Sequence, residues 1–322
     1  MAAATAPGAI SGLQFRIHTC PYVGDGHAAI AEEGCITMSA DVNSIAVIGA
    51  GTMGSGIALT AATHGIKAWQ IDISEEQLER AKASHAKILS RNVQKERMTQ
   101  DEADAAAGRI EYVTDMADSK DADWAVEAAT EHAPTKKKLF WKMLETYRDD
   151  VVLATNTSSI SITDIASELE DQAGRVIGMH FFNPVPIMKL VEVIKGLATT
   201  EETTQRTIEL SKRMGKVPVP ANDRAGFVSN RVLMPMINEA FYAWMEGVAE
   251  PEHIDEIMKL GCNFPMGPLR LADFIGLDVC HDIMMVLYTE LGQDKYFPCP
   301  KLRQLVTAGR LGDKTGRGVY SY

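Results

Sequence analysis

The chain has 322 residues, 46% of them hydrophobic, and a formal net charge of -11, which is the composition of a globular protein long enough for two domains. The acidic balance argues against a general affinity for nucleic acid or for an anionic membrane. No apolar run reaches the roughly 20 residues of a transmembrane helix. The five cysteines form no CxxC pair, so we expect reduced thiols in a cytoplasmic protein.

The first 43 residues are rich in alanine and glycine and show little periodicity. We therefore interpret residues 1–43 as an extension that precedes the folded domains. The segment lacks the basic region and apolar core of a secretory signal. Its histidines and cysteines fit no standard zinc spacing, so we predict no metal site at His18, Cys20, His27 and Cys35.

A glycine-rich turn follows the first predicted strand, at 44–48, and opens a predicted helix. Its GxGxxG spacing permits a tight turn, a close approach of backbone to a pyrophosphate, and close packing of helix on strand. A second predicted strand, at 67–71, ends at Asp72, where a carboxylate would bind ribose hydroxyls and repel the extra phosphate of NADP. These features predict an NAD site, and the alternative is a helix-packing glycine cluster beside a surface aspartate. The turn residues expected at the dinucleotide are Gly49, Gly51, Thr52, Met53 and Gly54.

A long polar helix is predicted from Ser74 to about Glu96, with Gln77 placed to complete a capping box. Lys87, Arg91 and Lys95 recur every fourth residue and so share one face of it. In an acidic protein this stripe could hold a phosphate-rich part of a substrate. A solvated helix face is the alternative, and the residues alone favour it.

Predicted strands and helices alternate through the next hundred residues. The strands are expected at 109–113, 123–128, 151–154, 176–181, 190–194 and 216–219, and the helices at 134–147 and 201–214. This alternation predicts a mostly parallel sheet covered on both faces, a Rossmann-type domain over residues 44–221. Ligands of such sheets bind beyond the carboxyl ends of the strands. Four polar residues come just after predicted strands and should gather there: Glu131, Lys136, Ser158 and His180.

From residue 222 onward the sequence predicts helices only, at 226–246, 252–260, 277–291 and 300–308. Asp223 is placed to cap the first of them, and Pro235 should kink it. Residues 222–322 are therefore interpreted as an all-α domain. Val319 and Tyr320, in a turn-rich tail, are available to dock on its core.

Two residues of opposite character lie in consecutive apolar runs, His180 and Glu192. A histidine held by a carboxylate beside a hydroxyl is what removal of a proton from an alcohol needs, because imidazole titrates near neutral pH and the carboxylate fixes its tautomer. Ser158 and Ser159 supply a hydroxyl pair. The alternatives are a structural histidine and serines that cap a short helix beginning at Ile162.

Six motifs along residues 44–322 together resemble the L-3-hydroxyacyl-CoA dehydrogenase family, and within it the bacterial 3-hydroxybutyryl-CoA dehydrogenases. They are VIGAGTMGSGIA, EAATEHAPTKKKLF, TNTSSISIT, MHFFNPVPIMKLVEVI, DRAGFVSNRVLMPMINEA and LGDKTGRGVY. The resemblance implies reversible hydride transfer between C3 of a 3-hydroxyacyl-CoA and NAD, in short-chain fatty acid metabolism or β-oxidation. It also implies a homodimer formed through the helical domain. The chain departs from the pattern of the family in two places, the extension at residues 1–43 and the residues Ala133 and Pro134.

The resemblance also implies a role for each matching residue. His180 corresponds to the catalytic base and Glu192 to its orienting partner, while Ser158 and Asn230 correspond to residues that hold the substrate oxygens. Lys95 corresponds to a lysine that meets coenzyme A, which favours function for the basic stripe. Glu131 and Lys136 correspond to residues that line the nicotinamide half of the cofactor site, and Asn156 and Ser158 are also expected at the cofactor.

Two other functions stay open on the sequence. One is a dehydrogenase of free hydroxy acids on the same architecture, which would need no coenzyme A contact. The other is a catalytically silent NAD-binding or structural protein descended from such an enzyme. The presence of His180, Glu192, Ser158 and Asn230 together counts against a silent protein.

Overall fold

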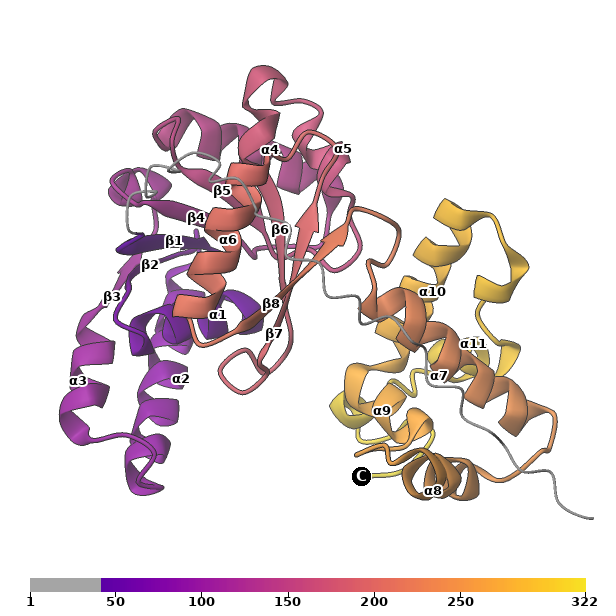
Figure 1. The fold of residues 1–322 in the computed structure, drawn as a ribbon. Coiled ribbons are helices and arrows are strands. Elements are labelled where there is room, and N and C mark those ends of the chain that lie inside the picture. The colour runs from indigo at the N-terminus through magenta and orange to yellow at the C-terminus, as the bar shows by residue number, and fades with distance from the viewer. Residues whose placement is uncertain (1–41) are drawn as a thin grey trace, which may run out of the picture. The chain divides into compact units, whose positions relative to one another are not determined.

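The computed structural model describes residues 42–322 (Figure 1), so the predictions for the extension and for His18, Cys20, His27 and Cys35 lie outside the described residues. The strands are β1 Ser44–Ile48, β2 Lys67–Ile71, β3 Ile110–Val113, β4 Trp124–Glu127, β5 Val152–Thr155, β6 Val176–Phe181, β7 Leu190–Lys195 and β8 Val217–Asn222. The helices of the sheet part are α1 Thr52–Thr63, α2 Glu75–Gln94, α3 Gln100–Gly108, α4 Ala133–Thr146, α5 Ile162–Ala166 and α6 Glu201–Arg213. The remaining helices are α7 Ser229–Met245, α8 Pro251–Cys262, α9 Pro268–Ile275, α10 Leu277–Leu291 and α11 Pro300–Thr307.

Within residues 42–322, eight strands form one sheet in the order β3-β2-β1-β4-β5-β6-β7-β8. Neighbouring strands are parallel except β6 and β7, which are antiparallel. The predicted fold class, a mostly parallel Rossmann-type sheet followed by helices, is confirmed. The carboxyl ends of β1, β4 and β5 lie on one edge, and this edge carries the site.

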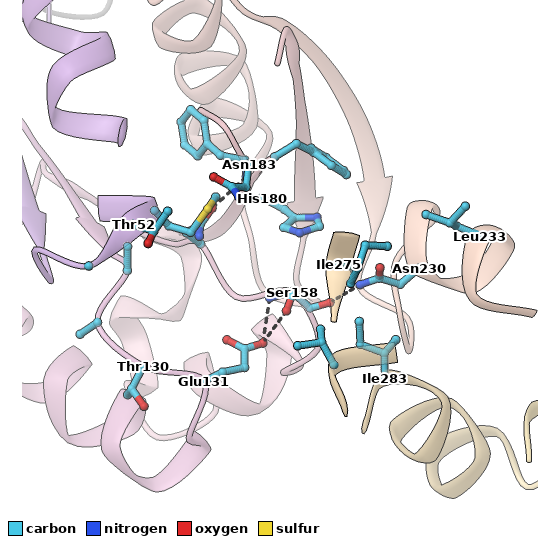
Figure 2. Close-up of a pocket in the computed structure, with 18 of the residues that line it drawn as sticks. Thr52, Thr130, Glu131, Ser158, His180, Asn183, Asn230, Leu233, Ile275 and Ile283 are labelled. Atoms are coloured by element: carbon cyan, nitrogen blue, oxygen red, sulfur yellow. Dashed lines mark hydrogen bonds between the residues drawn. The ribbon is translucent and has the colours of Figure 1, made fainter. Parts of the chain in front are cut away.

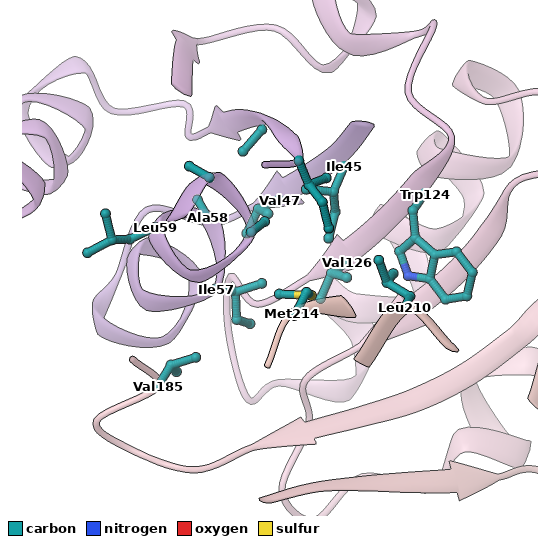
Figure 3. Close-up of a cluster of buried hydrophobic side chains, with 14 of the residues drawn as sticks. Ile45, Val47, Ile57, Ala58, Leu59, Trp124, Val126, Val185, Leu210 and Met214 are labelled. Atoms are coloured by element: carbon teal, nitrogen blue, oxygen red, sulfur yellow. The ribbon is translucent and has the colours of Figure 1, made fainter. Parts of the chain in front are cut away.

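The apolar run of β1 is explained by helices on both faces of the sheet. Ile45 and Val47 point into one cluster of buried residues, whereas Ala46 and Ile48 point into another, because successive strand residues face opposite sides. Figure 3 shows the first cluster, in which α1 packs on β1 and β4. Burying one such Ile or Val contributes about 1.5–3 kcal/mol, so the run favours a place for β1 inside the sheet, between β2 and β4.

Three local expectations need correction. The helices α3 and α9 were not predicted. His180 lies within β6 rather than after it. Asp223 does not cap the helix that follows it; its carboxylate accepts from Ser161 Oγ (2.7 Å) and Thr163 N (2.8 Å) at the start of α5.

The helices α7 to α11 share a separate core, against which Val319 and Tyr320 of the tail pack as predicted. The buried carboxylate of Asp273 accepts from the backbone N–H groups of both tail residues, at 2.9 Å each. Cys262, Cys280 and Cys299 are free thiols. Among the helices of residues 42–322, none is long and apolar enough to cross a membrane.

Candidate active site

The turn between β1 and α1 has a conformation that only glycine fits. Gly49 has φ +105°, and a Cβ on Gly54 would come within 1.9 Å of the Gly49 carbonyl oxygen. A Cβ on Gly51 would meet no atom within 4 Å, so the turn is open there. Gly51, as the N-cap of α1, has no side chain to accept from the first N–H groups of the helix, and such groups suit a phosphate.

Asp72, at the end of β2, is held against this turn. One carboxylate oxygen accepts from Ala50 N (2.8 Å), and the other accepts from Ser74 N (3.0 Å). Ser74 caps α2 by accepting from Gln77 N. The acidic group therefore lies beside the open turn, where it can meet a ribose.

A cavity of about 570 Å³ extends from this turn to α7, α9 and α10. It brings together most of the predicted site residues: Gly51, Thr52, Met53, Glu131, Lys136, Asn156, Ser158, His180 and Asn230. Gly49 and Gly54 shape the turn without lining the cavity, and Glu192 lies behind His180. Apolar residues from the helical part complete the wall: Leu233, Met234, Phe274, Ile275, Val279 and Ile283.

His180 and Glu192 face each other across the antiparallel β6–β7 pair. His180 Nδ1 lies 2.7 Å from Glu192 Oε2, and the two residues are 7% and 4% exposed. Burial alone would raise the pKa of Glu192, but hydrogen bonds from His180 and Ser229 outweigh it and hold that pKa below its usual value. A carboxylate at this distance requires the proton on Nδ1, which leaves Nε2 as the atom able to accept a proton.

Aromatic rings flank the imidazole. The ring centroid of His180 lies 4.7 Å from that of Phe182 and 5.7 Å from that of Phe227. Phe227 has φ +48°, an unusual backbone conformation for a bulky residue. The rings restrict the orientations of the imidazole and limit access of water to it.

Ser158 belongs to a turn that Glu131 holds. Glu131 Oε1 accepts from the backbone N–H and the hydroxyl of both Ser158 and Ser159, at 2.8–3.1 Å, and from Thr157 Oγ1 at 2.7 Å. Partial burial would raise the pKa of Glu131, but Lys136 and these donors hold it below its usual value. The alternative that either serine caps α5 is wrong, because Ser161 does so.

Asn230, in the first turn of α7, reaches the same place. Its Nδ2 donates to the backbone oxygen of Ser158 at 3.0 Å. Figure 2 shows Ser158 between Glu131 and Asn230, with the ring of His180 turned toward the same space. The second N–H of the Asn230 amide is available for another acceptor.

Glu127 is a site residue that the sequence analysis missed. Its carboxylate, fully buried at the end of β4, pairs with Lys136 Nζ (2.5 Å) and accepts from Thr155 Oγ1 (2.8 Å). Lys136 also lies 3.7 Å from Glu131. A glutamate that ends an otherwise apolar strand was the available signal, since a buried charge needs a partner.

Ser229 is a second missed residue. Its hydroxyl donates to Glu192 Oε2 at 2.8 Å, and its backbone N–H donates to Oε1 at 3.0 Å. A serine at the start of a predicted helix, next to Asn230, was the only signal in the sequence. The first turn of α7 is thereby attached to the partner of His180.

The other predicted residues take supporting or peripheral positions. Asn156 Oδ1 accepts from Phe181 N at 2.9 Å and so holds the end of β6. Lys95 is the exposed C-cap of α2 and does not line the cavity. Lys87 and Arg91 are also exposed on α2, which leaves their role open.

Two family models together match nearly the whole described chain. One is the 3-hydroxyacyl-CoA dehydrogenase NAD binding domain, over residues 44–224, and the other is the 3-hydroxyacyl-CoA dehydrogenase C-terminal domain, over residues 226–322. A probable 3-hydroxybutyryl-CoA dehydrogenase of Bacillus subtilis is 50% identical over 88% of this chain and 98% of its own length. A 3-hydroxybutyryl-CoA dehydrogenase of Bradyrhizobium diazoefficiens is 44% identical over 88% of this chain and 97% of its own.

A solved structure agrees with these matches. The (S)-3-hydroxybutyryl-CoA dehydrogenase from Ralstonia eutropha has a TM-score of 0.85 at 48% identity, over 88% of this chain and 99% of its own. The resemblance inferred from the six motifs is thus confirmed by three independent kinds of match. The chain belongs to the 3-hydroxyacyl-CoA dehydrogenase family.

Proposed function

We propose that the protein is an NAD-dependent (S)-3-hydroxybutyryl-CoA dehydrogenase that interconverts 3-hydroxybutyryl-CoA and acetoacetyl-CoA. The observation that carries this proposal is the His180–Glu192 pair beside a cavity that also reaches the glycine turn, Ser158 and Asn230. The names of the relatives point to the same substrate.

The residues at the glycine turn fit NAD. The open space at Gly51, the uncapped start of α1 and the Asp72 carboxylate match a pyrophosphate followed by a ribose. Bound there, NAD would supply the nicotinamide carbon that takes a hydride from C3 of the substrate. The acidic Asp72 favours NAD over NADP, since it would repel a ribose phosphate.

The proton of the substrate hydroxyl would pass to His180. As C3 loses a hydride and its oxygen becomes a carbonyl, Nε2 takes the hydroxyl proton, and Glu192 stabilises the imidazolium through Nδ1. Reduction of the 3-oxo group reverses each step. The buried pair keeps this proton transfer away from bulk water.

Ser158 and Asn230 would hold the substrate oxygens. The Ser158 hydroxyl donates to Glu131 at 3.1 Å and would turn to donate to the 3-oxygen of the substrate, since Glu131 keeps its other donors. Asn230 retains one N–H for a carbonyl oxygen. The apolar side chains from α7, α9 and α10 suit the acyl chain. Lys95 would meet the phosphates of coenzyme A.

The homodimer is part of the same proposal. Exposed apolar side chains on α7 and α8 support contact with a second copy through the helical part: Val232, Ile257 and Leu260.

The acyl-CoA class of the substrate is common to the relatives' names. A cytoplasmic location stays a prediction.

The function is tested by NADH consumption with acetoacetyl-CoA, a longer 3-oxoacyl-CoA and free acetoacetate, compared side by side. We expect turnover with the thioesters and little with free acetoacetate. His180→Ala should lower kcat by roughly a hundredfold to ten-thousandfold and leave NADH binding intact, with the exposed His253→Ala as control. Comparable rates on free acetoacetate would favour a hydroxy-acid dehydrogenase, and unchanged turnover in His180→Ala would refute the mechanism.

A further inference from the structure

We propose that Ser229 is a positioning residue for the acid–base pair: by holding the Glu192 carboxylate, it limits how strongly that carboxylate stabilises the protonated form of His180. This inference rests on the proposed function, since it assumes that His180 exchanges a proton with substrate. It concerns a residue that touches neither the substrate cavity nor the dinucleotide turn.

The shared acceptor atom carries the argument. Glu192 Oε2 lies 2.7 Å from His180 Nδ1 and also accepts from Ser229 Oγ at 2.8 Å. Glu192 Oε1 accepts from Ser229 N at 3.0 Å and from Val228 N at 3.3 Å. Both oxygens of this buried carboxylate are therefore occupied, and the serine hydroxyl competes with the imidazole for one of them.

The effect of the hydroxyl has a definite sign. A donor to a carboxylate draws negative charge toward itself. The hydrogen bonds from His180 and from Ser229 both lower the pKa of Glu192 in this way. Less charge then remains to stabilise an imidazolium on the other side of Oε2. Without the hydroxyl, His180 should hold its proton more tightly.

The ionisable surroundings of the pair do not supply another cause. Facing it from across the cavity are Glu131 and Lys136, which bond to the Ser158 turn and to Glu127. Strand β8, paired with β7, has no ionisable residue over Val217–Asn222. The ion pair between Lys195 and Glu201 of α6 lies at the far end of β7.

The arginines near the start of α7 point elsewhere. Arg224 lines a separate cavity with Asp164, Asp223 and Glu290, and Arg231 lines another with Glu239. Ser229 also belongs to the helical part, whereas His180 and Glu192 belong to the sheet. The hydroxyl thus links the strength of the base to the docking of α7.

The test compares pH profiles of kcat/KM for Ser229→Ala, Ser229→Thr and the unchanged protein, in both reaction directions. In Ser229→Ala the half-maximal pH of oxidation should rise by roughly half a pH unit, so the rate at low pH falls. In the reduction direction, kcat/KM should begin to fall at a pH that is higher by a similar amount. Ser229→Thr retains a hydroxyl and should restore both profiles.

Controls separate this inference from the proposed function. Ser167→Ala removes an exposed serine hydroxyl that bonds only to the backbone of α5, and thermal unfolding checks that each variant is folded. A folded Ser229→Ala with unshifted profiles, or a shift that Ser229→Thr fails to reverse, would overturn the inference alone. Normal turnover in His180→Ala would instead overturn the proposed function.

Discussion

At the scale of single residues, the three glutamates of the site have different duties. Glu192 partners His180, Glu131 holds the Ser158 turn, and Glu127 neutralises the buried Lys136. The sequence could indicate Glu131 and Glu192 because the family resemblance implies a role for each, whereas Glu127 opens one of the same motifs without such a role. It could not indicate which donors each carboxylate accepts from, because those donors come from segments distant in the chain.

Asp72 allows a direct test of cofactor choice. Asp72→Ala removes the predicted ribose acceptor and also the bond to Ala50 N in the glycine turn. The affinity for NADH should fall roughly tenfold to a hundredfold, and that for NADPH should fall less, because the repelling charge is gone. Fluorescence titration of both nucleotides measures this, with the exposed Asp104→Ala as control. If the ratio of the affinities for NADH and NADPH stayed the same, the predicted contact between Asp72 and the ribose would be contradicted.

At the scale of elements, the strands were the most predictable part of the molecule. The runs at 44–48, 67–71 and 176–181 coincide with β1, β2 and β6, because buried strands of a parallel sheet are largely apolar. The helix α3 escaped prediction because, with only Ala103 and Ala106 buried, it shows little amphipathic periodicity. Its capping box at Thr99 and Glu102 was the usable signal.

The direction of β7 was also readable in principle. A parallel crossover takes about a dozen residues or more, and the connection over 182–189 contains no helix. The antiparallel pairing is what sets His180 opposite Glu192. Spacing along the sequence does not reveal that opposition, since it depends on which residues of two strands come into register.

The end of α2 gives a prediction about coenzyme A. Lys95→Ala should raise the KM for acetoacetyl-CoA about twofold to fivefold, as expected for loss of one exposed ion pair of up to about 1 kcal/mol, and leave the KM for NADH unchanged. Lys87→Ala, two turns earlier on the same helix, is the matched control. If Lys95→Ala and Lys87→Ala had equal small effects, or if Lys95→Ala changed both KM values equally, the basic stripe would be a solvated helix face.

At the scale of the whole molecule, the tail supports a wall of the cavity. Asp273 is 1% exposed and accepts from Val319 N, Tyr320 N and Tyr322 Oη. It directly precedes Phe274 and Ile275, which line the cavity. The division into a sheet part and a helical part was predictable from periodicity, and so was the docking of Val319 and Tyr320 on the helical core. The hydrogen bonds from the tail to Asp273 of α9 were not predictable. The boundary after residue 221 and the homodimer stay predictions.

Removing that carboxylate should loosen both the tail and the wall. Asp273→Ala leaves three donors without their acceptor, which should lower the free energy of unfolding by about 2–4 kcal/mol and raise the KM for acetoacetyl-CoA. Thermal unfolding measures the stability, hydrogen exchange of residues 312–322 measures the loosening of the tail, and steady-state kinetics measure the KM. Asp313→Ala, which breaks only the exposed pair with Arg270, should change stability by less than about 1 kcal/mol. Similar losses in both variants would contradict the support role.

The hairpin of β6 and β7 keeps base and carboxylate on one rigid support, while Asn230 and Ser229 arrive on a helix that starts the other part. A hinge movement between the parts would therefore carry Asn230 and Ser229 away from the site. It would leave His180 beside Glu192. The proton acceptor would thus stay assembled between turnovers. Substrate binding would need only to bring α7 back against the sheet part.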